Sequence, residues 1–129
     1  MKSRRSFIIS SSLAALALNT AAHAEAERQK PFIHGFNFKF KRGVPEEEVA
    51  SLMKELAALK EKIPVLKELV VGKNEARWHR GFQYGQISIF KKKQDLMAYD
   101  QHPEHKKLVR KIGPKLAGGN AMDFIPLDF

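Results

Sequence analysis

The segment HGFNFKFKRGVPEEEVASLMKELAALKEKIPVLKELVVGKN, residues 34–74, decides the fold because its hydrophobic period changes within it. Over residues 32–41, His34 and four phenylalanines alternate with glycine, asparagine and lysine. Such a period of two is typical of a strand with one buried face. The segment therefore predicts a first strand that carries a histidine among its buried aromatic residues.

A helical period follows the first strand. Pro45 and three glutamates open it, which suits a helix start because proline needs no N–H partner there and acidic side chains favour the positive end of the helix dipole. The apolar residues then recur at spacings of three and four: Val49, Leu52, Met53, Leu56 and Leu59. We expect a helix of about four turns that ends before Pro64, because proline disfavours helical geometry at the residue before it.

The rest of the chain predicts three more strands and an interrupted helix. VLKELVVGKN is a short strand, EARWHRG a loop, and FQYGQISIF, residues 82–90, a third strand. KKQDLMAYDQ forms a short helix that breaks before Pro103, and PEHKKLVRKIGPKL forms a second helical piece that stops at Gly113 and Pro114. NAMDFIPLDF closes the chain as a strand, with Pro126 at an edge or at its end.

The order β-α-β-β-α-β predicts an α+β protein with a ferredoxin-like sandwich, in which both helices cover one face of a four-stranded antiparallel sheet. The second face is expected to be too apolar to stay in water, because Val70 lies opposite Leu69 and Val71 on its strand, and Ile87 and Ile89 alternate with aromatic residues. A second copy packed sheet to sheet would cover it. We therefore expect a homodimer.

Composition and charge exclude several classes of function. The 129 residues suffice for one globular domain, and the absence of cysteine excludes disulfides, thiolate metal sites and a cysteine nucleophile. The net charge is +9, and it is +6 without the three cations of residues 1–24. The basic clusters are interleaved with glutamates, which favours solvated faces, and we expect no nucleic-acid partner.

Residues 1–24 have the pattern of an export signal. Basic residues precede an apolar run from Phe7 to Leu18, which is too short to span a bilayer, and the segment ends in Ala22-His23-Ala24. Its SRRSFI resembles the twin-arginine signature, and an ordinary Sec signal is the alternative. We expect a signal peptide at 1–24, a flexible tail at 25–31 and one domain at 32–129. The mature protein would be periplasmic or secreted, without a stable membrane anchor.

From about Ile33 to Asp128 the chain resembles the stress-responsive dimeric α/β-barrel family, often called Dabb. The resemblance rests on His34 followed by FKFK, the Ile63-Pro64 pair before a strand that ends in Gly72, and AYDQHPEH. It implies a dimeric barrel built from two ferredoxin-like sandwiches. The family contains many members with no assigned activity, so the resemblance implies a fold more than a function.

The resemblance also implies a pocket between sheet and helices. The plant polyketide cyclases of this family use a tyrosine and a histidine from the matching element, here Tyr99 and His105, and His34 would line the same pocket. Those cyclases carry a further pocket histidine at the start of the third strand, where this chain has Tyr84. The resemblance therefore implies a related pocket with a different substrate.

The residues support this site independently of the family. Pro103 breaks the helix near His102 and restarts it, so His105 falls in a first turn, where unpaired N–H groups favour a neutral imidazole. A neutral imidazole as base and a phenol as oxyanion donor suit proton abstraction next to a carbonyl. His105 and Tyr99 are the candidate catalytic residues, and His34, Tyr84 and His102 are candidate ligand contacts. The alternative roles are a buried, hydrogen-bonded imidazole for His34, a helix cap or packing residue for His102, and core packing for Tyr99.

Two other site types fit the sequence less well. A metal site at His102, Glu104 and His105 lacks a typical zinc spacing, so we expect no metal and no other cofactor. A haem- or quinone-modifying monooxygenase of similar architecture would use Asn37 and Trp78, but their positions do not match. A non-catalytic module that binds a small apolar or aromatic ligand and a small-molecule enzyme, cyclase-like or lyase-like, remain the two functional hypotheses.

Overall fold

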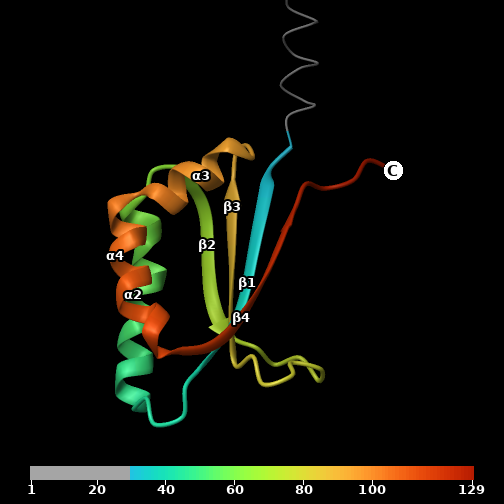
Figure 1. Ribbon diagram of the computed structural model, residues 1–129. Helices are drawn as coiled ribbons and strands as arrows, with labels where there is room; N and C mark the ends of the chain where they lie inside the picture. The colour runs from blue at the N-terminus through green and yellow to red at the C-terminus, as the bar shows by residue number, and fades with distance from the viewer. Residues whose placement is uncertain (1–29) are drawn as a thin grey trace, which may run out of the picture. The chain divides into compact units, whose positions relative to one another are not determined.

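The alternating segment forms strand β1 (Phe32–Phe40) inside a four-stranded antiparallel sheet with the order β2-β3-β1-β4 (Figure 1). The computed structural model describes residues 30–129, so the predicted signal peptide and residues 25–29 of the predicted tail lie outside the described part. β1 has a neighbour on both sides, and its phenylalanines Phe32, Phe38 and Phe40 are buried. The predicted first strand is therefore confirmed, at the centre of the sheet.

Helix α2 (Glu46–Lys62) follows as predicted. Its first turn carries Glu46, Glu47 and Glu48 and its last turn carries two lysines, so both ends match the helix dipole. Val49, Leu52, Leu56 and Leu59 are buried against the sheet, and burial of each of these leucines contributes about 2 kcal/mol. Leu52→Ala would cost roughly 2–5 kcal/mol because it would also leave a cavity.

The second helical region breaks where the sequence predicts. Helix α3 (Gln94–Gln101) ends at His102, whose backbone is extended, and helix α4 (Pro103–Ile112) begins at the proline. A short 3₁₀ turn, η1 (Gly113–Lys115), leads into the last strand. The break turns the chain, so that α4 packs beside α2 while α3 lies at one end of the helical layer (Figure 1).

The remaining strands are β2 (Leu66–Lys73), β3 (Tyr84–Phe90) and β4 (Leu116–Phe124). The closing strand starts earlier than the sequence predicts. It begins at Leu116 and pairs with β1 through Gly118 and Gly119, which lie before the predicted start of the strand. The strand also ends before Pro126, which cannot donate to a ladder. The pairing with β1 overrides the weak strand propensity of the two glycines.

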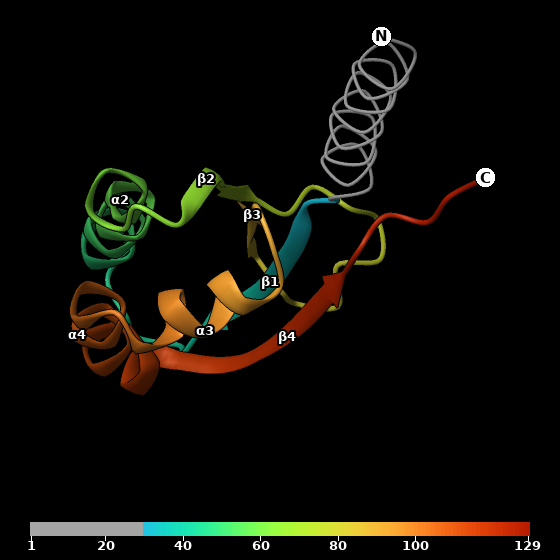
Figure 2. The ribbon, with the colours of Figure 1, turned by 90° about the horizontal axis from the view of Figure 1, so that it is seen from above.

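The helices cover one face of the sheet, and the other face is open (Figure 2). The protein thus has the ferredoxin-like α+β fold that the order of elements predicts. The open face carries apolar side chains that are 39–61% exposed: Val70, Ile87, Met122 and Phe124. Within residues 30–129, none of the helices combines the length and the apolar character that a membrane crossing needs.

Candidate functional site

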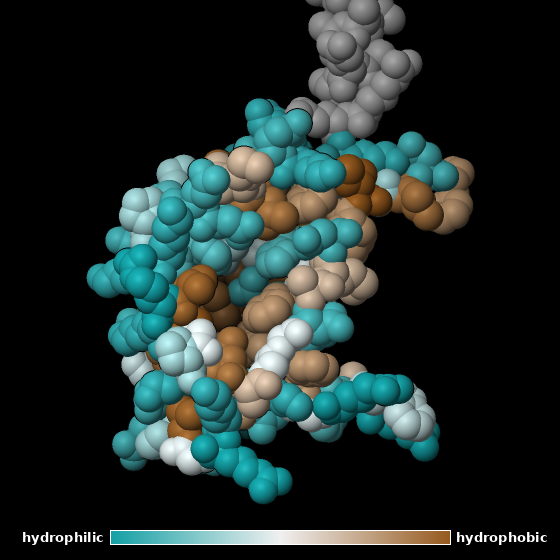
Figure 3. All heavy atoms as spheres, viewed as in Figure 1, coloured by the Kyte–Doolittle hydropathy of each residue, from teal (hydrophilic) through white to brown (hydrophobic). Residues whose placement is uncertain are grey.

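A cavity of about 280 Å³ lies between the sheet and the helical layer. Figure 3 shows recessed apolar surface in the gap between these two layers. Most of the lining is apolar, and the polar side chains come from β1, β3 and the α3–α4 region. The lining residues are His34, Phe36, Phe38, Leu56, Gln86, Tyr99, Asp100, His105, Leu108, Val109, Ile112, Leu116 and Ala121.

His105 enters this cavity from the first turn of α4, as predicted from the helix break. Its Nδ1 lies 3.1 Å from the backbone carbonyl oxygen of Asp100. Because a carbonyl oxygen only accepts, Nδ1 must carry the proton and donate it. In the neutral ring, Nε2 then holds a free lone pair, and it has no hydrogen-bond partner among residues 30–129. The imidazole is therefore arranged as an acceptor or a base.

Tyr99 lies beside His105, with the two ring centroids 4.3 Å apart. The tyrosine is 1% exposed and also packs on Phe90. Burial raises the pKa of the Tyr99 hydroxyl to about 12, and the charge of Asp100 acts in the same direction. The neighbouring polar side chains of Gln86 and Ser88 lower this pKa by less. The phenol therefore stays neutral at physiological pH and can donate a hydrogen bond.

A buried hydroxyl group lies next to this pair. Ser88 is fully buried on β3, yet its Oγ makes no hydrogen bond of normal geometry within the described residues. Ser88 therefore affects the pKa of Tyr99 because it lies close to the hydroxyl, and not through a hydrogen bond of normal geometry. An unsatisfied buried hydroxyl costs about 1–3 kcal/mol, so the polar cluster of Gln86, Ser88 and Tyr99 is maintained at some cost in stability.

His34 contributes a second histidine to the cavity, from β1. It lies directly opposite Asp123 of β4 in the register, and its Nδ1 contacts Oδ1 of that carboxylate. Nδ1–H donates a hydrogen bond to the carboxylate, so Nε2 of His34 is again the nitrogen left for a ligand. A hydrogen bond from Nδ1 thus orients each of the two histidines, and each ring presents Nε2 to the cavity as a hydrogen-bond acceptor.

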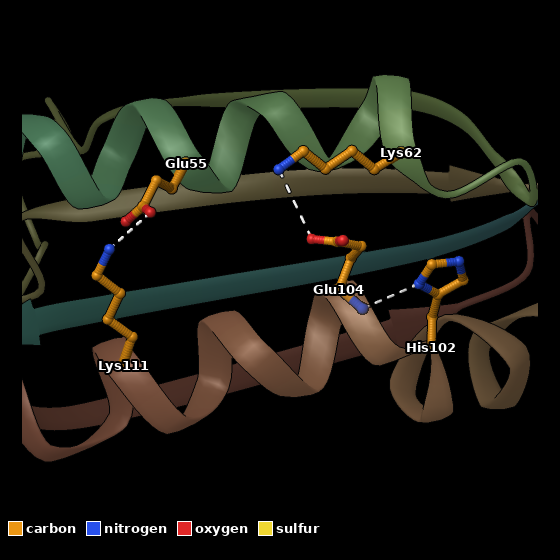
Figure 4. A network of polar contacts seen from close by, with 5 residues as sticks. All are labelled: Glu55, Lys62, His102, Glu104 and Lys111. Atoms are coloured by element: carbon orange, nitrogen blue, oxygen red, sulfur yellow. Dashed lines mark hydrogen bonds and ion pairs between the residues drawn. The ribbon is translucent and has the colours of Figure 1, made fainter.

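His102 has a different place. It is the N-cap of α4, where its Nδ1 accepts a hydrogen bond of 3.1 Å from the backbone N–H of Glu104 (Figure 4). The neighbouring ion pairs Lys62–Glu104 and Lys111–Glu55 connect α2 to α4. His102 does not line the cavity, and its contacts stabilise the helix that carries His105.

Tyr84 also lies outside the cavity. It stands at the start of β3 and packs on Phe38 and Phe40, with ring centroids 6.0 and 5.6 Å away. It lines a separate hollow between β2, β3 and the start of α2. Of the predicted site residues, the cavity therefore brings together His34, Tyr99 and His105.

Sequence reasoning missed four polar residues in or beside the cavity: Gln86, Ser88, Asp100 and Asp123. The period-two pattern of β3 places Gln86 on the inner face, and this was an available signal. Asp123 becomes informative only through its register opposite His34. Asp100 contributes a backbone carbonyl, a role for which the sequence carries no signal.

The alternative sites do not assemble in the described part of the chain. Residues 30–129 contain no cluster of three or more histidine, aspartate or glutamate side chains placed to hold a metal ion. Asn37 lines a hollow on the open face of the sheet. Trp78 is 76% exposed in the loop between β2 and β3. Neither residue contributes to the cavity described above.

The pattern of the stress-responsive A/B barrel domain matches residues 33–126. The chain belongs to this family. The match runs from β1 to just beyond β4, so the A/B barrel domain includes the whole cavity. No curated protein matches the sequence.

Solved structures support the same assignment of fold. An Arabidopsis thaliana protein is 26% identical, with a TM-score of 0.70 over 76% of this chain and 97% of that chain. A dimeric ferredoxin-like protein of unknown function from Thermobifida fusca is 22% identical, with a TM-score of 0.67 over 77% and 93%. The hydroxynitrile lyase of Passiflora edulis is 14% identical, with a TM-score of 0.72 over 78% and 97%. At the two lower identities the likeness shows the fold alone.

Proposed function

We propose that this A/B barrel protein is exported, forms a homodimer and binds a small aromatic or apolar molecule that carries a hydroxyl or carbonyl group. The binding part of the proposal rests on the cavity of about 280 Å³, in which His34, Tyr99 and His105 come together between apolar walls. Apolar walls with a few convergent polar groups are the usual form of a small-molecule site. The volume suits a ligand with a single ring, because sites for drug-sized ligands start near 300 Å³.

The polar groups determine which atoms the ligand should offer. Nε2 of His34 and Nε2 of His105 are acceptors in the neutral rings, and the Tyr99 hydroxyl donates or accepts. A ligand hydroxyl can donate to an imidazole, and a ligand carbonyl can accept from Tyr99. The phenylalanines of β1 favour an aromatic ring over an aliphatic chain, because aromatic rings pack on one another at offset or edge-on angles.

The open face of the sheet supports the dimer. Val70, Ile87 and Met122 expose apolar surface on the side that the helices leave uncovered. Solved structures of the same fold include proteins described as dimeric. A second copy packed sheet to sheet would remove this surface from water.

The sequence of residues 1–24 supports export, with Arg4 and Arg5 as the twin-arginine pair. Changing both arginines to lysine should then leave the precursor in the cytoplasm. Export that continues in a strain without the twin-arginine translocase would instead assign the signal to Sec.

Catalysis is the second candidate function, and the orientation of His105 favours it. Nε2 of His105 would take a proton from a carbon next to a carbonyl, the C–H electron pair would move into the enolate, and Tyr99 would donate a hydrogen bond to the enolate oxygen. The same fold carries an enzyme in the hydroxynitrile lyase of Passiflora edulis. Deuterium exchange into the methyl group of acetophenone, followed by NMR in D₂O, tests this step. A rate equal to that of buffer would leave binding as the function.

The test of binding is a thermal melt in the presence of 4-methylphenol or toluene, which differ by one hydroxyl. Ligand that binds the folded state raises Tm, so both compounds should stabilise the protein, and 4-methylphenol more strongly. Tyr99→Phe and His105→Ala should weaken 4-methylphenol binding by roughly tenfold, the loss expected for one hydrogen bond. His79→Ala, in the exposed loop between β2 and β3, is the control and should bind normally. Failure of both compounds to stabilise the parent protein would reject the proposal.

A further inference from the structure

The Phe36 ring lies directly over Gly119. A Cβ atom added at Gly119 would lie 2.3 Å from Cζ and 2.7 Å from Cε2 of Phe36. Real Cβ atoms essentially never approach other atoms below 3.0 Å, so the ring and a side chain at position 119 exclude each other. Gly119 has an ordinary backbone conformation, and its glycine is therefore required for space and not for backbone freedom.

The ring that occupies this space is part of the cavity wall. Phe36 lines the cavity next to Ala121, its partner on β4, and Gly119 lies two residues before Ala121 on the same face of that strand. The ring also stacks on Phe38, with centroids 5.5 Å apart and planes 20° from parallel. The Phe36 ring is thus confined on one side by the backbone of β4 and on another by the Phe38 ring.

We propose that the contact between Phe36 and Gly119 sets the size of ligand that the cavity accepts on the side of β4. This inference rests on the proposed binding function. A methyl group at position 119 would push the ring away from the sheet, and the backbone below and Phe38 beside it leave the cavity as the direction of movement. The position of Phe36 over Gly119 therefore keeps room for a ligand ring that carries a short substituent.

A neighbouring residue provides a matched control. Gly118 is on the same strand, but a Cβ there would meet only the ends of Lys39 and Phe82 side chains, at 3.3 and 3.8 Å. Gly118 pairs with Lys39 and points to the opposite face of the sheet. Gly118→Ala therefore makes the same chemical change without reaching the cavity.

The experiment combines crystal structures of Gly119→Ala and Gly118→Ala with calorimetric titration of phenol and 4-butylphenol. In Gly119→Ala we expect the Phe36 ring to turn into the cavity. Affinity for 4-butylphenol should fall by roughly tenfold or more relative to phenol, because a few methylenes excluded from an apolar pocket cost at least that factor. Gly118→Ala should bind both compounds as the parent protein does. The double variant Gly119→Ala/Phe36→Leu should recover 4-butylphenol binding.

Two results would overturn the inference: a Phe36 ring that stays in place while β4 moves, or an equal loss of affinity for both phenols. The inference would also be contradicted if the double variant folds but does not recover 4-butylphenol binding. A parent protein that binds neither phenol would overturn the proposed function instead. In that case the crystal structures would still decide whether Gly119 controls the position of the ring.

Discussion

Burial determines the chemistry of the Tyr99 hydroxyl. The side chain is enclosed by Phe90, His105 and the inner face of β3, and its pKa rises to about 12 because the phenolate would lose its hydration. His105, in contrast, is only partly buried, and a backbone carbonyl determines its tautomer. The two rings therefore form a donor and an acceptor without any charged group between them. This combination suits a neutral ligand.

The raised pKa of Tyr99 predicts a loss of stability in alkali. Between pH 10 and pH 12 the unfolded chain releases this proton, while the folded protein keeps it. The free energy of unfolding should then fall with rising pH, by on the order of 2 kcal/mol from this residue. Urea denaturation at pH 9 and pH 11.5 measures the fall, which should be smaller in Tyr99→Phe. If the free energy of unfolding falls equally in the parent protein and in Tyr99→Phe, the raised pKa of Tyr99 is not its cause. Tyr84→Phe is the control for the removal of a tyrosine hydroxyl.

At the scale of the elements, the break between α3 and α4 builds the site. Pro103 ends one helix and begins the next, and this places Tyr99 in the last turn of α3 and His105 in the first turn of α4. A continuous helix would bond the Asp100 carbonyl within its own ladder. The break leaves that carbonyl free to orient the His105 imidazole.

His102 should therefore matter for stability more than for binding. Its ring caps α4, so His102→Ala should lower the free energy of unfolding by about 1 kcal/mol, while His102→Asn should keep most of it. Urea denaturation provides the measurement. His79→Ala is the matched control, because His79 accepts a similar bond from Gly81 N–H in a loop and not at a helix end. An equal effect of the two alanine substitutions, or loss of 4-methylphenol binding in His102→Ala, would contradict the capping role.

The sequence predicts most of the elements because their signals are local. The alternation of β1, the apolar period of α2 and the proline of the helix break each act within a few residues, and each was confirmed. The start of β4 was missed because two glycines have weak strand propensity, and only pairing with β1 makes them part of the sheet. The contact of His34 with Asp123 was missed for the same reason, since it depends on a register between strands far apart in the sequence.

At the scale of the whole molecule, the open sheet face should hold two copies together. Ile87 lies at the centre of this face, between Gly35 and Val70 in the register, so a charge there would be buried by a partner. Light scattering of the parent protein without residues 1–24 should give about twice the monomer mass, and Ile87→Glu should give the monomer mass. Met97→Glu, an exposed position on α3, is the control and should remain dimeric. A monomeric parent at micromolar concentration would mean that the open face is covered in another way.

The most direct test of the binding site is a crystal structure of the protein with 4-methylphenol. We predict a ring in the cavity that packs on Phe36 and Phe38, with its hydroxyl within hydrogen-bond distance of Tyr99 and of Nε2 of His105 or His34. The same crystals of Tyr99→Phe, at the same ligand concentration, should show weaker density for the ring. A cavity that stays empty in the parent protein, at concentrations that stabilise it in solution, would place the site elsewhere and contradict the central claim.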